Sequence, residues 1–554
     1  MSALRTEEVL HLRRTLARAR AQERADLLGA TFNRPIRSPK ALREWHDLLL
    51  FLLAHPYDAG ELAAVTTELD RVVGLANDMV RRGERPRYAL INTGLEGAPL
   101  QTTFTLHLTR WLLQHWRDHM ELFSVEAEHE EFAGLLRLLL PQAEWETVDQ
   151  PAGDAYELLD RTFGPSRAVQ LQQLVQGLDA LRVDEGTREH LWARMQVNMK
   201  VEGAPGCGMT FARCPISEVH FLPDGLQREV DLRKVVNEPV SAPIRISAQQ
   251  QEALKGTARI VLATLHRETD PVTHAGAVEL FDMGRGLRIA LFHLDVAHRL
   301  PFDSYVGFMA FRNGVPLAYG GAWLFPGKSK VGINVFPALR GGESAWFFAQ
   351  LLRLYRQRFR VDRFEAENYQ LGHGNPDGLK SGAYWFYYRL GFRPLTKALQ
   401  RSAEHAFKKL SSHKGYQVPL KLLKELVEHG LELDLADKEA MLIDTTALTT
   451  ALQRHVVQHH AGDRARAMRK ALERLGATLP LGDLAQWTPD ERTAFYLMAL
   501  PVDLVPDLEQ WPVLERRQLV ALIRAKGAAL ENTHQALLVR ATRLLKCWSD
   551  RSQV

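Results

Sequence analysis

Cysteine is scarce in this chain: only Cys207, Cys214 and Cys547 occur among 554 residues. Three thiols cannot form a disulfide framework, and their scarcity favours a reducing compartment. Long hydrophobic runs are also lacking. The most apolar stretch, residues 48–54, is far shorter than the roughly 20 residues that a membrane-spanning helix needs. Because the chain starts with a charged helical pattern rather than a signal peptide, we expect a cytoplasmic protein with no membrane partner.

An excess of one charge is missing as well, because 70 basic residues stand against 66 acidic ones. A protein that binds nucleic acid needs a concentrated basic surface, so we expect no nucleic-acid partner. Internal repeats and low-complexity tracts are absent from the sequence too. What remains is the composition of an ordinary globular protein, with 46% hydrophobic and 25% charged residues. This length predicts about three to four domains.

Hydrophobic spacing divides the chain into four parts. Residues 1–200 carry Leu and Ala at helical spacing and predict a mostly helical domain, with one strand expected at 87–94. Residues 201–247 are rich in Pro and Gly and predict a linker or irregular region. Residues 248–398 alternate helix and strand, and residues 399–554 are helical again. We therefore predict an α/β fold, with a mixed sheet and helices in the centre, flanked by largely α-helical N- and C-terminal regions.

Two local signals support the central α/β part. Ser247 precedes an amphipathic helical pattern and has the side chain of a helix N-cap. Asn313 and Gly314 separate two alternating apolar segments. This dipeptide is preferred in two-residue type I′ turns, because both positions need a positive φ. We expect a β-hairpin there.

A glycine-rich loop precedes the helix predicted at 344–360. Gly341 and Gly342 lie in this loop, and such glycines let the backbone approach a phosphate group. The first N–H groups of the helix would point at the anion, and Arg340 could add a charged contact. A plain tight turn between strand and helix explains the same residues, so the loop alone leaves both interpretations open.

The segments around this loop resemble the GCN5-related N-acetyltransferase (GNAT) superfamily. Their order is strand 331–336, the loop, a helix, a second strand and the segment SGAYWFYYRLGF at 381–392. Arg340 and Ala345 match the family's pyrophosphate loop. The family's closing helix-to-strand motif is matched by Ala383, Tyr387, Arg389, Gly391 and Phe392. The family's central glycine and its asparagine are replaced by Glu343 and Lys380.

The resemblance implies a GNAT-like mixed sheet over residues 248–398 and an acyl-coenzyme A co-substrate, such as acetyl-coenzyme A, with no metal. It implies transfer of the acyl group to an amine of a small molecule or a protein. The cofactor-binding residues that it implies are Val335, Phe336, Arg340, Gly341, Gly342, Ser344, Ala345 and Lys380. Two alternatives remain. One is a non-catalytic binding or scaffold protein with a degenerate core, and the other is a transferase that uses another activated donor, such as aminoacyl-tRNA.

Attack of an amine on a thioester requires a base for the amine and an acid for the departing thiolate. The resemblance assigns the acid role to Tyr387, whose alternative role is that of a packed core aromatic residue. In the strand expected at 364–370, Glu365 and Glu367 share one face and are candidate general bases. A solvated acidic face explains them equally well. His298 is a weaker candidate for the base.

The acceptor site is expected beside the same sheet. Glu268 and Asp270 lie in the polar loop 266–275, where acetyltransferases of this kind build part of the acceptor pocket. Tyr319 is a further substrate-binding candidate, because the resemblance implies that the pantetheine arm lies beside the strand end 319–323. A polar loop with an Asp-Pro turn is the alternative for the two acids. A backbone N–H of residues 331–337 is expected to stabilise the oxyanion.

Neither group of potential metal ligands has the spacing of a known site. Cys207, Cys214 and His220 lack the second pair of ligands that structural zinc sites carry. His455 and His459 lie four residues apart on a predicted helix, without the intervening Glu of a metalloprotease motif. The sequence therefore predicts no metal.

Overall fold

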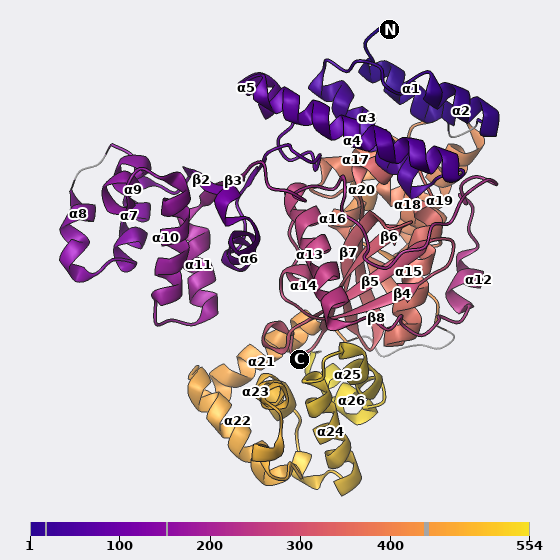
Figure 1. Ribbon diagram of the computed structural model, residues 1–554. Helices are drawn as coiled ribbons and strands as arrows, with labels where there is room; N and C mark the ends of the chain where they lie inside the picture. The colour runs from indigo at the N-terminus through magenta and orange to yellow at the C-terminus, as the bar shows by residue number, and fades with distance from the viewer. Residues whose placement is uncertain (1, 17–18, 151–152, 437–442, 553–554) are drawn as a thin grey trace.

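The computed structural model describes residues 2–16, 19–150, 153–436 and 443–552. These residues form a mixed α/β structure with a large central sheet and a separate small one (Figure 1). In these ranges, no helix is both long enough and apolar enough to cross a membrane.

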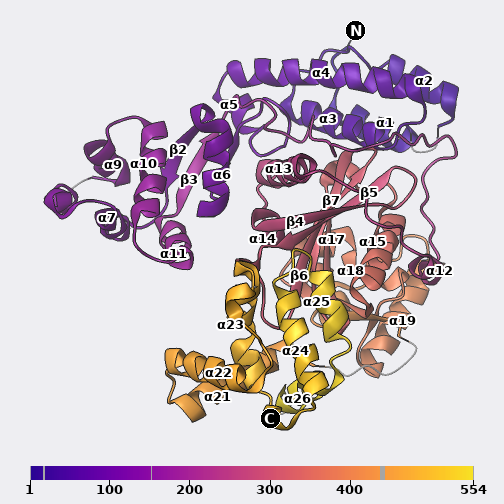
Figure 2. The ribbon, with the colours of Figure 1, turned by 60° about the horizontal axis from the view of Figure 1, so that its bottom comes forward.

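Four N-terminal helices lie together at one end of the central sheet (Figures 1 and 2). They are α1 (Thr6–Leu16), α2 (Ala21–Gly29), α3 (Pro39–Ala54) and α4 (Ala59–Arg81). Ser38 caps α3, accepting a hydrogen bond from the N–H of Ala41. The most apolar run of the sequence, 48–54, is the second half of α3. That half is buried between α4 and the short helix η4 (Pro337–Leu339), which explains its composition.

Residues 100–201 form a smaller α/β unit that projects to one side of the central sheet (Figure 1). Its main elements are β1 (Leu100–Thr102), α6 (Leu106–Trp116), β2 (Met120–Val125), α7 (His129–Leu138), α9 (Ala155–Phe163), α10 (Arg167–Ala180), α11 (Glu185–Met195) and β3 (Val197–Val201). The strand predicted at 87–94 is wrong. That segment contains the end of α5 (Glu84–Tyr88) and turns, because Asn92 and Gly94 adopt positive φ values of 57° and 73°.

Eight strands form the central sheet, in the order β10-β11-β9-β8-β7-β6-β5-β4. Their bounds are β4 (Ala275–Asp282), β5 (Leu287–Leu294), β6 (Ser304–Arg312), β7 (Val315–Phe325), β8 (Gly327–Val335), β9 (Val361–Ala366), β10 (Arg393–Pro394) and β11 (Leu431–Asp434). Neighbours are antiparallel except β8 and β9, which run parallel and are connected through helix α15 (Ser344–Phe359). The α/β fold class is thereby confirmed.

Two local predictions in the centre are confirmed. Ser247 and Gln250 form a reciprocal capping box at the start of α13 (Ala248–Thr264). Asn313 and Gly314 connect β6 to β7 with φ values of 48° and 80°. The Asn313 side chain also donates hydrogen bonds to the carbonyls of Ala54 and His220, at 2.9 and 3.0 Å, and so ties the hairpin to the end of α3.

The sheet differs from expectation at its far edge. Residues 431–434 were expected to be helical but form β11, which lies between β9 and β10. Leu431 and Leu433 are buried there, in the alternation of a strand. The strand expected at 364–370 ends at Ala366, and residues 368–371 form the short helix α16 instead. The central sheet therefore takes strands from both sides of residue 398.

The remaining helices lie at the other end of the sheet and on both of its faces (Figure 2). Near the sheet lie α12 (Leu232–Asn237), α14 (Asp270–Thr273), α16 (Asn368–Leu371), α17 (Pro376–Ser381), α18 (Ala383–Arg389), α19 (Lys397–Ser412) and α20 (Leu420–Val427). Pro271 of α14 lies against Gly307 of β6, whereas Tyr355 of α15 contacts Phe308 on the opposite face. The C-terminal helices are α21 (Thr445–His460), α22 (Arg464–Thr478), α23 (Pro489–Asp503), α24 (Val513–Lys526), α25 (Glu531–Leu538) and α26 (Thr542–Ser552). The C-terminal helices have their own apolar core, which reaches the sheet at Phe302 and Phe325.

Candidate functional site

The parallel strands β8 and β9 pair at one end only. Residues 327–330 of β8 lie beside residues 361–365 of β9. Residues 331–335 continue their pairing with β7, but no described strand pairs with them on the β9 side. A strand edge of this kind leaves backbone N–H and C=O groups available to a ligand. The side chain of Gln370 approaches this edge at Gly332.

The edge leads directly into the glycine loop, which the N-terminal helices partly cover. Arg13 of α1 donates hydrogen bonds to the carbonyls of Ala338 and Arg340, at 2.7 and 2.8 Å. Gly342 lies so close to the ring of His55 that an added Cβ would be 3.1 Å from it. Gly341, with φ of +83°, faces open space. The loop is therefore closed on the Gly342 side and open at Gly341.

Arginines surround the open side of the loop. A pocket of about 660 Å³ lies here between α1, α3 and the loop. Its lining consists of His11, Arg13, Arg14, Thr15, Ala19, Glu23, Phe51, Arg228, Arg340 and Gly341. Four guanidinium groups against one carboxylate give this pocket a positively charged lining, which is suited to an anion. Three of these arginines come from outside the residues that the sequence motif covers, so sequence reasoning missed them.

Glu343, which replaces the family's glycine, points into the protein. Its side chain is buried and forms an ion pair with buried Arg312 at 2.8 Å. The N–H of Gln227 donates to it at 2.8 Å, and Arg285 lies at 3.3 Å. Burial lowers the pKa of Arg312 to about 10, against the opposing effect of Glu343. Because these partners neutralise the carboxylate, it does not oppose an anion at the loop.

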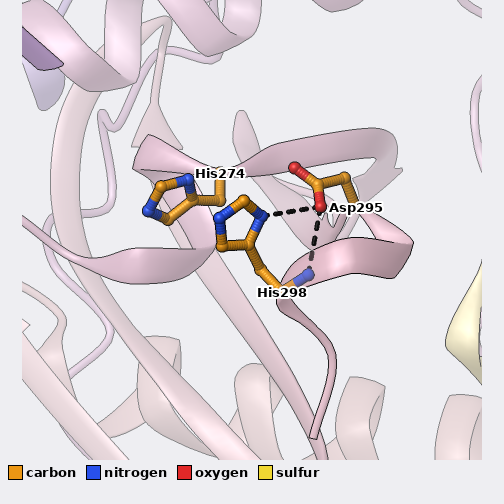
Figure 3. Close-up of side chains that lie close together, drawn as sticks. All are labelled: His274, Asp295 and His298. Carbon is orange, nitrogen blue, oxygen red and sulfur yellow. Dashed lines mark hydrogen bonds and ion pairs between the residues drawn. The ribbon is translucent and has the colours of Figure 1, made fainter. Parts of the chain in front are cut away.

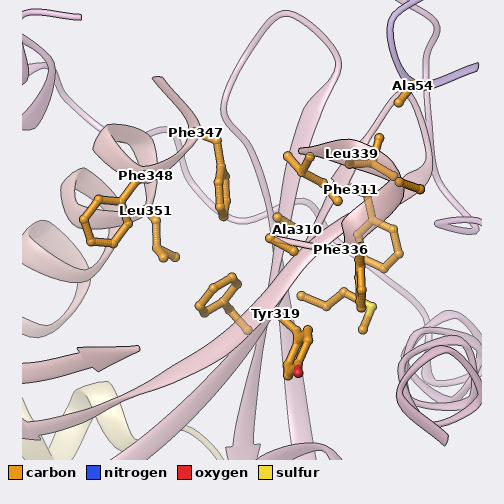
Figure 4. Close-up of a cluster of buried hydrophobic side chains, with 14 of the residues drawn as sticks. Ala54, Ala310, Phe311, Tyr319, Phe336, Leu339, Phe347, Phe348 and Leu351 are labelled. Carbon is orange, nitrogen blue, oxygen red and sulfur yellow. The ribbon is translucent and has the colours of Figure 1, made fainter. Parts of the chain in front are cut away.

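The residues predicted around the loop divide into core and edge positions. Figure 4 shows the buried cluster to which Phe336 and Tyr319 belong, together with Phe347, Phe348 and Leu351 of α15. The rings of Phe336 and Tyr319 stack at 5.3 Å. Val335, Ser344 and Ala345 are half-buried at the edge of the loop. Glu343, at the N-cap of α15, gives no side-chain cap to the first N–H groups of the helix, which favours an anionic ligand there.

Tyr387 lies in an aromatic cluster beneath α15. Its ring makes edge contacts with Phe348 and Phe392, at 5.4 and 5.3 Å between centroids. Only 2% of the residue is exposed, and its hydroxyl has no hydrogen-bond partner among the described residues. Burial raises the pKa of Tyr387. The tyrosine therefore keeps its proton and could give it to a ligand that reaches the hydroxyl.

Lys380 does not join this group. It is exposed on α17 and is not part of the arginine-lined pocket. Gly382, in a left-handed conformation with φ of +72°, separates α17 from α18, so Lys380 and Tyr387 lie on different helices.

The two candidate bases are held by lysines of β8. Glu365 lies 2.7 Å from Lys328, and Glu367 lies 3.0 Å from Lys330. Glu365 lies on the face of β9 opposite Phe364, whose side chain belongs to the core that includes α15. Glu367 follows the end of β9, at the N-cap of α16, and its lysine partner is on the same face as that of Glu365. The structure therefore does not bring these acids to the side of the sheet on which Tyr387 contacts α15.

The two acids of the predicted acceptor loop have different surroundings. Glu268 accepts hydrogen bonds from the N–H and Oγ1 of Thr105, at 3.2 and 2.6 Å, and from Oγ1 of Thr273 at 2.8 Å. Burial raises the pKa of Glu268, against these hydrogen bonds. Its carboxylate joins the central sheet to the unit of residues 100–201. Asp270 is exposed at the start of α14 and remains available to a ligand.

An aromatic pair that the sequence did not single out lies on the same face as the lysine–glutamate pairs. Tyr305 and Trp323 are cross-strand partners in β6 and β7, and their rings stack at 4.1 Å. Trp323 is also the register partner of Lys330. Burial raises the pKa of Tyr305 to about 12, and the charge of Asp270 adds to this effect. A half-exposed aromatic pair with acids nearby suits a cationic or aromatic ligand.

The weaker base candidate, His298, belongs to a histidine cluster (Figure 3). Its Nδ1 lies 2.7 Å from Oδ1 of Asp295, and its ring stacks on that of His274. Cys207 and Cys214 do not belong to any described group of three ligands that could hold a metal.

Compared with protein-family models, with curated proteins and with solved structures, this chain shows no match. Its chemistry therefore has to be argued from its own geometry.

Proposed function

We propose that this protein is an acyl-coenzyme A-dependent N-acyltransferase with a GNAT-like central domain. The observation that carries the proposal is the separation of β8 from β9 next to the arginine-lined pocket. An extended pantetheine arm could add to the free edge of residues 331–335 as a further strand does, while its pyrophosphate meets Arg340 and the start of α15.

The reaction would use both faces of the sheet. The acceptor nitrogen attacks the thioester carbon, and a backbone N–H of residues 331–335 stabilises the oxyanion. The C–S bond then breaks, and the thiolate takes the proton of Tyr387. The proton of the amine passes to Glu367, directly or through water. Asp270 and the Tyr305–Trp323 pair lie on the face from which the amine would approach.

A scaffold protein with a degenerate core is the second candidate. It is favoured by Lys380, which lies away from the pocket, and by His55, which closes the loop at Gly342. Glu343 no longer favours it, because Arg312 neutralises that carboxylate inside the protein.

Binding of coenzyme A separates these candidates. Acetyl-coenzyme A and free coenzyme A should each raise the Tm of the full-length protein, because a ligand of the native state stabilises it. Arg340→Ala should weaken this binding by about tenfold, since it removes one charge-assisted contact. Arg182→Ala, at an exposed position of the 100–201 unit, is the matched control. Absence of any coenzyme A binding would reject the proposal, whereas binding without acyl transfer to any amine would favour the scaffold.

A further inference from the structure

Three potential metal ligands meet where β4 begins and β5 ends (Figure 3). One atom each of His274, Asp295 and His298 lies within 4.8 Å of the other two. The two rings stack with 3.8 Å between centroids and 16° between planes. The carboxylate of Asp295 fixes the ring of His298 through the 2.7 Å contact with Nδ1. Asp is also a direct ligand in zinc sites, so this carboxylate would exchange its contact with the His298 ring for the ion.

His274 has the free donor atom that such a site needs. Its Nδ1 is buried and has no hydrogen-bond partner among the described residues. On its other side, the ring of His107 lies 4.6 Å away.

We propose that His274, His298 and Asp295 bind a divalent transition-metal ion of the zinc class, with His107 next to the fourth position. Two imidazoles and one carboxylate are donors that zinc accepts, at about 2.0–2.2 Å from the ion. Tetrahedral ligands at that distance stand roughly 3.4 Å apart. Binding therefore requires the stacked rings to tilt until the present spacing, up to 4.8 Å, has closed.

A second histidine cluster among the described residues also has a buried ring nitrogen without a hydrogen-bond partner, on His455, but its carboxylate is already paired with an arginine. His455, His460 and Asp503 also lie within 4.8 Å of one another. However, Arg474 donates to Oδ1 of Asp503 at 3.0 Å and places a positive charge beside that carboxylate. A metal cation there would be repelled. By contrast, the Asp295 carboxylate pairs with His298, and no arginine is its ion-pair partner among the described residues. The buried Arg259 acts on His274 and His107 from a distance, but its guanidinium donates to the carbonyls of Val272 and Thr273.

The position of the proposed site gives it a structural role. His107 lies in the first turn of α6, where its N–H and that of Leu106 donate to Glu189. His274 directly follows α14, and Glu268 already joins Thr105 to this region. A metal ion held between these segments would strengthen the contact between the 100–201 unit and the central sheet. This inference does not rest on the proposed acyl transfer.

Zinc binding to the chelator-treated full-length protein tests the proposal. In competition with a chromophoric chelator, the wild type should bind one equivalent of Zn²⁺. His274→Ala and Asp295→Asn should each weaken that binding by at least roughly tenfold. His455→Ala, in the second cluster, is the matched control and should bind as the wild type does. Zn²⁺ should also raise the Tm of the wild type and of the control, but not that of the two site variants.

Two results would overturn the proposal. One is that the wild type takes no Zn²⁺ from the chromophoric chelator, which would mean that the stacked histidine pair does not bind a metal. The other is equal binding by His274→Ala and the wild type. Circular dichroism of the metal-free variants checks their folding, and Asp295→Asn, at a 41% exposed side chain, covers the case in which His274→Ala does not fold. Co²⁺ provides a second readout, because its visible absorption should appear in the wild type and be lost in both site variants.

Discussion

Tyr387 keeps a buried hydroxyl without a hydrogen-bond partner among the described residues, and this unpaired group costs free energy unless a ligand meets it. Tyr387→Phe should therefore leave the Tm equal or higher. If the tyrosine protonates the thiolate, the same change should lower kcat while coenzyme A affinity stays constant. Melting curves, coenzyme A titration and a thiol-release assay measure the three quantities. Unchanged turnover together with a higher Tm would make Tyr387 a core residue only.

The buried ring of His55 should make the free energy of unfolding depend on pH. Burial, with the added charge of Arg312, lowers the pKa of His55 to about 3 in the folded protein, whereas an unperturbed histidine titrates near 6.5. The unfolded chain thus takes up the proton first, so the stabilisation is complete above pH 6.5 and is lost as pH falls toward 3. His55→Gln should reduce the fall in Tm between pH 7.5 and 5. The matched control, His373→Gln at an exposed position, should follow the wild type.

At the scale of single elements, the glycine loop depends on backbone conformation. Gly341 has φ of +83°, a conformation that costs an alanine about 1 kcal/mol or more. Gly341→Ala should lower stability by this amount and weaken coenzyme A binding, because the loop must shift.

Gly134→Ala is the control in helix α7, where nothing lies within 4 Å of an added Cβ. It should raise stability by up to about 1 kcal/mol. Denaturant unfolding and coenzyme A titration measure both effects. Equal coenzyme A affinity in Gly341→Ala and the wild type would separate this loop from the ligand.

Local chemistry explains which elements were predictable. The Ser247 cap and the Asn313–Gly314 turn depend on neighbouring residues alone, and both are confirmed. Strand β11 was missed because its four residues follow a strong helical pattern, and their strand conformation depends on pairing with β9. The strand predicted at 364–370 was too long for the converse reason. Pairing with β11 ends at Ala366, so the residues after it have no partner strand.

For the whole molecule, a buried ionic pair joins the C-terminal helices to the sheet. Lys526 and Glu531 are fully buried and lie 2.9 Å apart, and Lys526 also donates to the carbonyl of Asp303. Lys526→Met removes the nearer cation of the buried Glu531 carboxylate and leaves it only Arg299, at 3.9 Å, so it should cost about 3–5 kcal/mol. Lys526→Met combined with Glu531→Leu should recover part of this loss.

Urea unfolding and limited proteolysis of the C-terminal helices measure this effect. The control is Lys470→Met, because the pair of Lys470 and Glu473 is exposed and should contribute nothing measurable. An equal response of the two single variants would show that burial does not set the strength of the inner pair.

The sequence by itself determined the α/β centre, its hairpin and the helix α15, because hydrophobic periodicity, helix caps and turns act between neighbours in the chain. Its three cysteines alone excluded a disulfide framework. Only the tertiary structure decided the chemistry that surrounds these elements. It brought Arg13 and Arg228 to the loop of Arg340, and it paired Glu343 with Arg312. It also stacked His274 on His298. The charge and hydrogen bonding of such groups depend on partners far away in the chain, which no local pattern encodes.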